Sequence, residues 1–294
     1  MNFKEQLLER INYAESVIRS YLPSEEGYQK TILEAMNYAV LVGGKRLRPI
    51  IINECYHLFG GEEKVHEPFM AAIEFLHTAS LVHDDLPCMD NDEYRRGKKT
   101  VHALYNEAVG VLTGDSLLNY TYETACRAFS FGNVERVSRA LSVLSSKAGV
   151  FGMIGGQMVD LESEGKVVDY KTLDFIHTNK TAALIEAAML VGAILAGASN
   201  DNLTVLSRVA LDIGFAYQIQ DDILDVIGDP DVLGKPVGSD EGLKKTTYVS
   251  VFGLEKAKED VRFYSERAIK NLASFGEKSE FLISLVKMLI TREK

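Results

Sequence analysis

Apolar residues recur at intervals of three and four along almost all of the 294-residue chain, which is the spacing of an amphipathic α-helix. Leu7 and Ile11 set this pattern near the N-terminus, and Ile73 and Leu76 repeat it further along. No stretch alternates apolar and polar residues as a half-buried strand does, and no internal repeat or low-complexity linker is present. The sequence therefore predicts an all-α protein of roughly ten or more helices, folded as a single domain over residues 1–294.

The composition is that of a soluble globular protein, with 46% apolar and 25% charged residues. The net charge of −10 argues against a surface for nucleic acid or anionic lipid, because both attract basic proteins. Three cysteines at no metal-like spacing favour a reducing compartment, so we expect a cytoplasmic protein. The longest apolar run, Thr181–Ala198, contains Glu186 and falls short of the ~20 residues of a membrane span. It predicts a buried helix and no stable membrane association.

The segment His83–Gly97 carries five acidic residues within the ten positions from Asp84 to Glu93. Each carboxylate raises the cost of ionising the next, so such a cluster requires either full solvation or bound cations. An amphipathic helix runs directly into Asp84 and delivers these acids to the negative end of its dipole, which increases the cost. A solvated acidic loop and a metal site are both open at this point. Among metals, Mg²⁺ bound jointly by carboxylates and a phosphate suits these oxygen ligands best.

Asp84 and Asp90 could not serve one cation from a regular helix. At their spacing, the two side chains would point about 120° apart. Pro87 ends the helix between them, and we expect the extra residues of the loop to bring Asp90 back beside Asp84.

A second acidic cluster, Asp221, Asp222 and Asp225, lies on the predicted helix Leu203–Ile227. Asp221 and Asp225 stand four residues apart, where like charges destabilise an isolated helix, so we expect cations here too. Carboxylates cannot bind a phosphate directly, whereas Mg²⁺ held between two acidic walls can bind a diphosphate. Phosphate binding without a hydrolytic base or a nucleotide loop indicates chemistry at the carbon that carries the diphosphate.

Basic residues stand apart from the acidic clusters. Lys45, Arg46 and Arg48 follow Gly43-Gly44, and glycines let backbone N–H groups approach a ligand such as a phosphate. The spacing is not that of a P-loop, and the alternative is a solvated turn between helices. His77 lies two helical turns before the first acidic cluster on the same face, so it is either a packed side chain or part of a site.

Three glycines interrupt a helical pattern at Gly152, Gly155 and Gly156. Each costs about 1 kcal/mol relative to alanine, so we expect two helices, or a helix and a ligand, to lie unusually close there. Gln157 and Asp160 on the same helix are interpreted as buried polar groups with structural roles.

Lys180 begins an almost wholly apolar helix. Its side chain either extends to solvent, or it marks a buried cation or a helix distortion that exposes backbone carbonyls to a cavity. Further along, the Gly- and Lys-rich segment Asp229–Leu243 predicts either a connector or a lid over an anionic substrate.

Together these motifs resemble the trans-isoprenyl diphosphate synthase family, specifically its short-chain bacterial and plastid members. Gly43–Pro49 is similar to the family's isopentenyl diphosphate motif. Asp84-Asp85 with Asp90 is similar to its first aspartate-rich motif, in the form with two inserted residues, and Asp221–Asp225 to the second. Other matching positions follow in family order: Arg95-Arg96-Gly97, Lys180-Thr181, Phe215–Gln218, Gly234-Lys235 and Lys245–Tyr248. The resemblance covers nearly the whole chain and implies an isoprenoid-synthase-type bundle around a central cavity.

The resemblance also implies a role for each matching side chain. The ligands of about three Mg²⁺ ions, with Mn²⁺ as an alternative, would be Asp84, Asp85, Asp90, Asp221, Asp222 and Asp225. Isopentenyl diphosphate would contact Gly44, Lys45, Arg48, His77 and Arg96. The allylic diphosphate would contact Arg95, Lys180, Thr181, Gln218, Lys235 and Lys245. Lys180, Thr181 and Gln218 would also be catalytic, because they would stabilise the allylic carbocation.

The implied reaction is a prenyl transfer by ionisation, condensation and elimination. The allylic C–O bond ionises, the isopentenyl double bond attacks the carbocation, and the released pyrophosphate removes the proton. The expected product from dimethylallyl or geranyl diphosphate is farnesyl diphosphate, with geranylgeranyl diphosphate as the alternative. The resemblance further implies a homodimer.

Residues beneath the first aspartate motif leave the product length open. Farnesyl-forming relatives usually carry an aromatic residue five positions before the first Asp, where this chain has Ala79 followed by Ser80. Small residues there open the floor of the apolar tunnel and favour the longer product. Tyr120 and Tyr122 on the predicted helix Ala108–Phe129 could fill the same space. Because the rest of the chain resembles the farnesyl-forming enzymes, farnesyl diphosphate is slightly favoured over geranylgeranyl diphosphate as the expected product.

Four other protein classes explain less of the sequence. An HD-type metal phosphohydrolase would account for His83-Asp84, but not for the second acidic cluster or the Gly-Gly-Lys-Arg motif. A calcium module would need a spaced glycine and a terminal glutamate around Asp90-Asn91-Asp92. A non-catalytic synthase subunit would be expected to lack one aspartate motif. A class I terpene cyclase would lack the second motif and the isopentenyl site.

Overall fold

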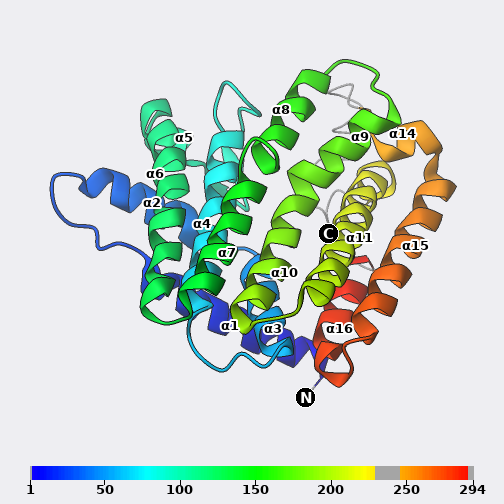
Figure 1. Cartoon of the computed structure of the whole chain (residues 1–294). Coiled ribbons are helices and arrows are strands. Elements are labelled where there is room, and N and C mark those ends of the chain that lie inside the picture. The colour runs from blue at the N-terminus through cyan, green and yellow to red at the C-terminus, as the bar shows by residue number, and fades with distance from the viewer. Residues whose placement is uncertain (1, 229–245, 291–294) are drawn as a thin grey trace.

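The computed structural model describes residues 2–228 and 246–290, and over these residues the protein is a bundle of α-helices (Figure 1). The only strands in this part of the chain are β1 (Tyr94–Arg95) and β2 (Lys98–Lys99), which pair antiparallel as a short hairpin. The predicted all-α class is confirmed.

The helices range from single turns to the 28 residues of α11. In chain order they are α1 (Phe3–Tyr21), α2 (Lys30–Leu41), α3 (Leu47–Leu58), α4 (Glu67–Asp84), α5 (Val101–Leu104), α6 (Glu107–Cys126), the 3₁₀-helix η1 (Arg127–Ser130), α7 (Val134–Ala148), α8 (Met153–Ser163), α9 (Tyr170–Ile176), the π-helix η2 (His177–Ala182), α10 (Ala183–Ala196), α11 (Asn200–Ile227), α14 (Tyr248–Phe252), α15 (Leu254–Ala273), the 3₁₀-helix η3 (Glu277–Ser279) and α16 (Glu280–Ile290).

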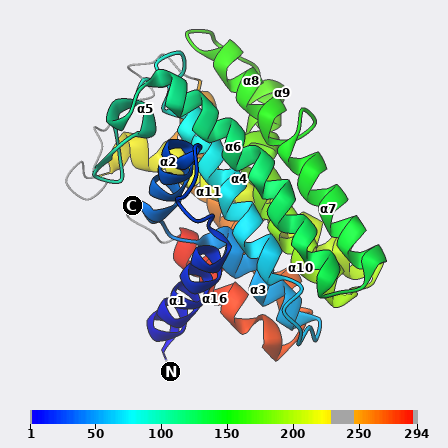
Figure 2. The same ribbon diagram turned by 90° about the vertical axis from the view of Figure 1, so that its left-hand side faces the viewer.

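The core forms around α4 and α10, two helices with buried apolar side chains on almost every side. Phe69 and Phe75 of α4 and Leu184 and Met189 of α10 are among the largest fully buried side chains. α4 packs against α3 and α6, whereas α10 packs against α3, α7 and α11. Figure 2 shows α4, α6, α7 and α10 side by side, and Figure 1 shows α15 outside α11. Helices that are apolar all round are expected in the centre of a large helical protein.

α9, η2 and α10 run on as one continuous helix, Tyr170–Ala196. Its 27 residues are long and apolar enough to cross a membrane by length and composition, which is more than the predicted apolar run suggested. However, 72% of its most apolar window is buried inside the protein. The helix is therefore a core helix, as predicted.

The π-helix η2 is held between two glycines on neighbouring helices. A Cβ atom on Gly156 of α8 would lie 2.2 Å from the backbone nitrogen of Lys180, and one on Gly214 of α11 would lie 2.2 Å from Cβ of Ala182. Side chains at either position would force the helices apart. The prediction that the glycine-rich helix approaches another helix unusually closely is thus confirmed at Gly156.

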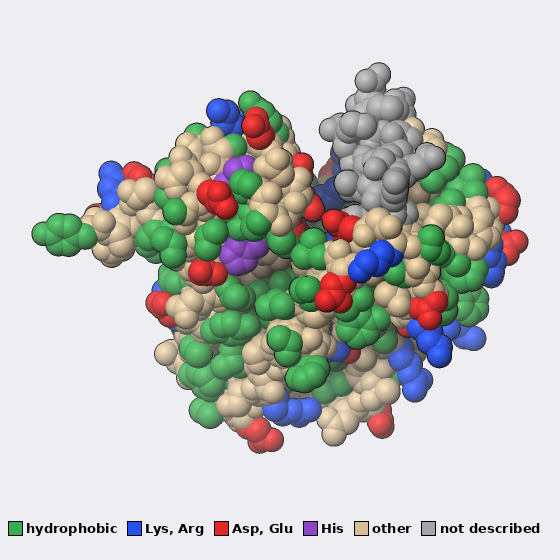
Figure 3. Space-filling model, turned by 90° about the horizontal axis from the view of Figure 1, so that it is seen from above, with side chains coloured by type: hydrophobic (Ala, Val, Ile, Leu, Met, Phe, Trp, Pro, Cys, Tyr) green, Lys and Arg blue, Asp and Glu red, His purple; other side chains and the backbone are tan. Residues whose placement is uncertain are grey.

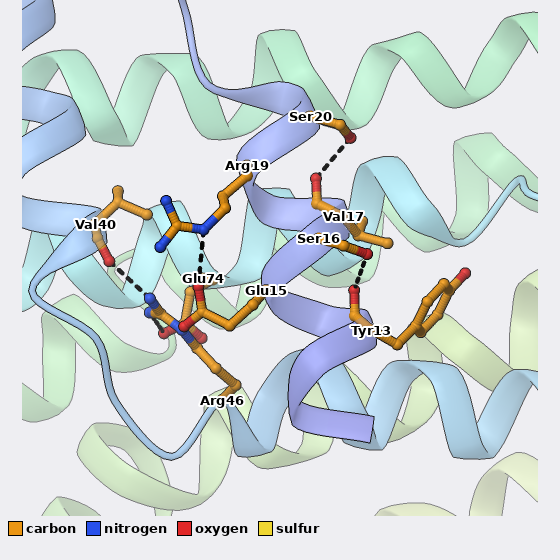
Figure 4. Close-up of polar contacts among 9 residues, drawn as sticks. All are labelled: Tyr13, Glu15, Ser16, Val17, Arg19, Ser20, Val40, Arg46 and Glu74. Atoms are coloured by element: carbon orange, nitrogen blue, oxygen red, sulfur yellow. Dashed lines mark hydrogen bonds and ion pairs between the residues drawn. The ribbon is translucent and has the colours of Figure 1, made fainter. Parts of the chain in front are cut away.

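Arg46 anchors the start of α3 in the core (Figure 4). Its side chain is almost fully buried, and its guanidinium donates to Glu15 over 2.7 Å, to Glu74 over 2.6 Å and to the carbonyl oxygen of Val40 over 2.8 Å. Its backbone is left-handed, with φ of 50°, at the residue directly before α3 begins. Of the three cations between positions 45 and 48, Arg46 is therefore structural.

Candidate active site

A cavity of about 520 Å³ lies at the centre of the bundle, between α3, α4, α6, α8, η2, α10 and α11. Its lining includes apolar side chains such as Ile51, Leu118 and Leu184. Polar and charged side chains line it as well: Arg48, His77, His83, Asp84, Lys180, Thr181, Gln218 and Asp221. Seen from above, the surface is hollowed near the middle, and acidic and basic side chains gather there (Figure 3). The site thus combines a large apolar lining with a set of charged and polar side chains.

The first aspartate motif follows directly from the end of α4 at Asp84. The backbone N–H of Asp90 donates to the carbonyl oxygen of Asp84 over 2.9 Å, so the loop brings Asp90 back, as predicted. Burial raises the pKa of Asp84 to about 6, and the charges of Asp90 and Asp85 add to this, although Lys180 opposes it. A divalent cation would relieve this crowding of carboxylates.

Asp85 turns away from the central cavity. It is buried, and its Oδ1 accepts a hydrogen bond from Nε of Arg95 over 2.7 Å and lies 2.6 Å from Nη2 of the same guanidinium. Burial raises the pKa of Asp85, and Arg95 opposes that rise. The resemblance assigned Asp85 to a metal and Arg95 to the allylic diphosphate, whereas here the two are paired with each other beside the β1–β2 hairpin. Neither is among the residues that line the cavity.

The aspartates of the second motif also differ in whether they line the cavity. Asp221 lines the central cavity, whereas Asp222 and Asp225 are buried within the bundle. Oδ2 of Asp222 accepts from the backbone N–H of Tyr248 over 2.7 Å, and its Oδ1 accepts from Gln218 over 3.3 Å. Asp222 therefore ties α11 to the start of α14.

The donor set suits magnesium that is shared with a substrate. Within residues 2–228 and 246–290, no three His, Cys, Asp or Glu side chains converge as a ready-made metal centre. Asp84 and Asp221 instead offer carboxylate oxygens from two walls of the same cavity. Mg²⁺ is usually held by one or two carboxylates together with substrate phosphates and water, so these residues fit the ion.

A cationic pocket lies beside the aspartate motifs. Nε of Arg48 is buried and has no hydrogen-bond partner among the residues that the structure describes. Burial lowers the pKa of both Arg48 and Arg96, and burial together with these arginines holds the pKa of His77 well below its usual value. Arg96 donates to the carbonyl oxygen of Gly43, and a Cβ atom on Gly44 would overlap its guanidinium. Gly44 thus leaves room for the Arg96 guanidinium beside the loop, and Lys45 is exposed on the same loop.

Lys180, Thr181 and Gln218 lie together in the wall of the cavity. Lys180 and Thr181 belong to the π-helix η2, so the helix distortion considered for Lys180 is present. Nζ of Lys180 donates to Oδ2 of Asp160 over 2.5 Å, and Oγ1 of Thr181 donates to Oε1 of Gln218 over 2.9 Å. π-helical turns are rare and often occur at functional sites.

The residues proposed to set product length separate into two groups. Ala79 and Ser80 line the cavity, as expected. Tyr120 and Tyr122 do not line it: the hydroxyl of Tyr120 donates to the carbonyl oxygen of Tyr21 over 3.0 Å, and its ring packs on Phe75. Neither tyrosine is thus a lining residue of this cavity, and the alternative that they limit product length stays a prediction. On α6 it is Leu118 that lines the cavity. Tyr120 stands about 160° around the helix from Leu118, whereas Tyr122 shares its face one turn further along.

Two predicted site residues, Lys235 and Lys245, lie outside the described residues. Conversely, Asp160 was assigned only a structural role, although it holds Lys180. A signal was present in the sequence, because Asp160 follows Gly156 by one helical turn and so shares its face. What the sequence could not show is which helix that face meets.

Comparison with known proteins identifies the family. A sequence profile described as Polyprenyl synthetase matches residues 29–284. A dimethylallyltranstransferase from Fischerella ambigua is 43% identical over 99% of this chain and 84% of its own length. The farnesyl diphosphate synthase of Escherichia coli is 39% identical over the full length of both chains, and a geranylgeranyl diphosphate synthase from Cyanophora paradoxa is 38% identical over 99% of this chain and 97% of its own length.

Solved structures agree with this assignment. The structure of an FPP/GFPP synthase from Zymomonas mobilis superimposes with a TM-score of 0.87 at 33% identity, covering 99% of both chains. A geranyltransferase from Helicobacter pylori, solved with magnesium and isoprenyl diphosphate, also gives a TM-score of 0.87, at 30% identity and 99% coverage of both chains. The chain belongs to the polyprenyl synthetase family and is a prenyl transferase with the isoprenoid-synthase fold.

Proposed function

We propose that this prenyl transferase condenses isopentenyl diphosphate with an allylic diphosphate to give a product of fifteen to twenty carbons. The observation that carries the proposal is a single cavity in which Asp84 and Asp221 stand at the mouth of an apolar tunnel, beside the cationic pocket of Arg48, His77 and Arg96. An anionic group at the mouth and a hydrocarbon chain below it match such a cavity. We further propose that residues 1–294 act as one domain.

Asp84, Asp90 and Asp221 would hold the magnesium ions, with Lys180, Lys235 and Lys245 completing the allylic diphosphate site. Bound Mg²⁺ supplies Lewis-acid stabilisation of the leaving diphosphate. Asp85 and Asp222 would act indirectly rather than as metal ligands. Asp85 holds Arg95, and Asp222 holds the start of α14. Fixed charges of this kind lower the barrier by meeting the negative charge that develops on the leaving group.

Lys45, Arg48 and Arg96 would bind the isopentenyl diphosphate, and His77 would act as a ligand rather than as a general base. Because the pKa of His77 is held well below its usual value, its imidazole is neutral at pH 7. A neutral imidazole can donate one hydrogen bond to a phosphate oxygen. Gly43-Gly44 would let this loop approach the diphosphate closely.

Thr181, Gln218 and Lys180 would face the allylic carbocation. The π-helical turn in η2 leaves carbonyl oxygens outside the regular α-helical bonding pattern, and these partial negative charges would stabilise a cation nearby. The hydrogen bond from Thr181 to Oε1 of Gln218 sets the orientation of the amide. Apolar side chains deeper in the cavity exclude water from the reacting carbon.

We propose geranylgeranyl diphosphate as the product. The proposal is supported by the small side chains Ala79 and Ser80 in the lining of the cavity, where neither Tyr120 nor Tyr122 is a lining residue. Farnesyl diphosphate remains the second candidate, because the chain matches the E. coli farnesyl diphosphate synthase over its full length. Chromatography of the product from geranyl diphosphate and labelled isopentenyl diphosphate with Mg²⁺ distinguishes the two. Release of phosphate without chain elongation would contradict the proposed function.

We also propose a cytoplasmic homodimer. Large apolar side chains, among them Leu112 on α6 and Phe151 between α7 and α8, are exposed in the single chain. Exposed apolar residues gathered on neighbouring elements are typical of an association surface. Analytical ultracentrifugation tests the expected mass of two chains, and a monomer would exclude the dimer.

A further inference from the structure

A second, smaller cavity lies behind the wall that carries Lys180 and Gln218. It has a volume of about 140 Å³, and its polar lining includes Asp160, His177 and Asp222. We call it the side cavity. Lys180 and Gln218 line both the side cavity and the central one, so these two side chains form the partition between them.

The side cavity suits ordered water. One water requires only about 10–15 Å³ of such space together with polar partners, so several fit. Nδ1 of His177 is buried at this cavity and has no hydrogen-bond partner among the residues with described positions. Burial lowers the pKa of His177 to about 4, so its ring is neutral at pH 7 and its nitrogens need hydrogen-bond partners. Water in the cavity would supply one.

Two carboxylates hold the partition from the side-cavity face. Oδ2 of Asp160 lies 2.5 Å from Nζ of Lys180, and Oδ1 of Asp222 accepts from the amide of Gln218 over 3.3 Å. The close contact of Gly156 with the backbone of Lys180 brings α8 near enough for Asp160, one turn later, to reach the ammonium group. The Lys180 side chain is 32% exposed and Asp160 19%, so their pairing holds a long, flexible side chain in place at a cavity wall.

We propose that the Lys180–Asp160 ion pair keeps water of the side cavity away from the allylic carbocation. The inference rests on the proposed function, because it concerns the cation formed there. Asp160 is a positioning residue, since it acts through Lys180. If water crossed the partition, its oxygen would bond to C1 of the allylic group as the C–O bond to the diphosphate breaks. The surplus proton would pass to the released pyrophosphate, and the products would be an allylic alcohol and pyrophosphate.

The test compares Asp160→Asn with the unaltered chain and with Glu162→Gln, a matched control at an exposed position on the same helix. Each protein is incubated with Mg²⁺ and geranyl diphosphate, with and without isopentenyl diphosphate, in ¹⁸O-labelled water. The ratio of geraniol to elongated diphosphate is then measured in the reactions with isopentenyl diphosphate, and the amount of geraniol in those without it. We expect Asp160→Asn to raise this ratio at least ten-fold, with ¹⁸O on C1 of the alcohol, whereas Glu162→Gln leaves it unchanged. Label on the carbon distinguishes attack on the cation from cleavage of a P–O bond.

An unchanged ratio in folded Asp160→Asn would overturn the inference, even if condensation became slower. Asp160→Glu keeps the carboxylate and serves as the second variant, with a ratio expected within about two-fold of the unaltered chain. A rise as large as that of Asp160→Asn would show that the ion pair is not the barrier. Failure of the unaltered chain to elongate geranyl diphosphate would instead overturn the proposed function.

Discussion

Nη2 of Arg95 lies 2.6 Å from Oδ1 of Asp85, and Nε of the same guanidinium donates to that oxygen over 2.7 Å. The second acid of the first aspartate motif is therefore engaged by a cation of the protein itself. Arg95 lies in the β1–β2 hairpin, and the next residue, Arg96, donates to the carbonyl oxygen of Gly43. One ion pair thus ties the aspartate motif to the hairpin that also supplies the cationic pocket.

This pairing predicts different effects for neighbouring aspartates. We expect Asp84→Asn to lower kcat by about 10²–10³-fold, because its carboxylate lines the cavity where leaving-group charge develops. Asp85→Asn should cost about 10–100-fold, as the loss of an outer-sphere partner does. Rates measured against Mg²⁺ concentration separate the two, since only Asp84→Asn should raise the concentration needed for half-maximal rate. Equal shifts would place both acids on the metal.

Arg46 and Arg48 are predicted to serve stability and binding respectively. Arg46→Met leaves Glu74 buried without its cation, so the free energy of unfolding should fall by about 3–5 kcal/mol. Arg48→Met should leave stability within about 1 kcal/mol and raise the KM for isopentenyl diphosphate at least ten-fold, because Arg48 lines the cavity. Urea denaturation and steady-state kinetics measure these effects. A stable Arg46→Met protein with a raised KM would reverse the assignment.

Product length should respond to Ala79 but not to Tyr120. Ala79→Phe places a ring in the tunnel, so the main product should shorten by at least one five-carbon unit. Tyr120→Phe is the comparison, because it removes only a hydrogen bond to Tyr21 away from the cavity and should leave the product unchanged. Chromatography of the dephosphorylated products measures the product length of both variants. The opposite pattern would show that Tyr120 on α6, rather than Ala79 on α4, limits product length.

Gly156→Ala is predicted to disturb both stability and catalysis. The new methyl group would meet backbone atoms of Asn179 and Lys180, and overpacking of this kind typically costs about 1–3 kcal/mol. Because the clash falls on the π-helix η2, kcat should fall by more than the KM for the allylic substrate changes. Thermal melting and kinetics test this. Unaltered kcat in a destabilised protein would show that η2 tolerates displacement.

Stability should decrease as the pH falls from 6.5 toward 4, partly through His66. Burial, followed by the nearby His57, lowers the pKa of His66 from 6.5 to about 4, and its ring nitrogens contact oxygens of Glu63 and Asn53. The unfolded chain then binds the proton more readily, so the stability present above pH 6.5 is lost progressively down to about pH 4. The full loss from this residue is about 3 kcal/mol, at about 1.4 kcal/mol per pKa unit.

Urea denaturation of the unaltered chain and of His66→Gln, at pH 7 and at pH 5, measures this contribution. The difference in stability between the two pH values should be smaller in His66→Gln, because that side chain does not titrate. An identical difference in both proteins would assign the pH dependence to other groups.

Local patterns in the sequence were sufficient for the helical class, the buried apolar helix and the return of Asp90 to Asp84. Each depends on residues that are close together in the chain. The spacing of apolar side chains predicted the helices, the apolar run around Glu186 predicted the buried helix, and Pro87 after α4 predicted the return of Asp90. The motifs also led to the family, because they combine acids, glycines and cations in a specific order.

Which partner meets each side chain was decided only by the tertiary structure. Helical spacing shows that Asp84 and Asp85 point in different directions. It cannot show that Asp85 pairs with Arg95 while Asp84 lines the cavity. The same limit applies to Leu118 and Tyr120 on α6, and to Asp160 with Lys180. The sequence by itself determined the helices and the chemical groups they carry. Packing between helices distant in the chain determined which of those groups face the cavity, because rotation about each helix axis is set by its neighbours.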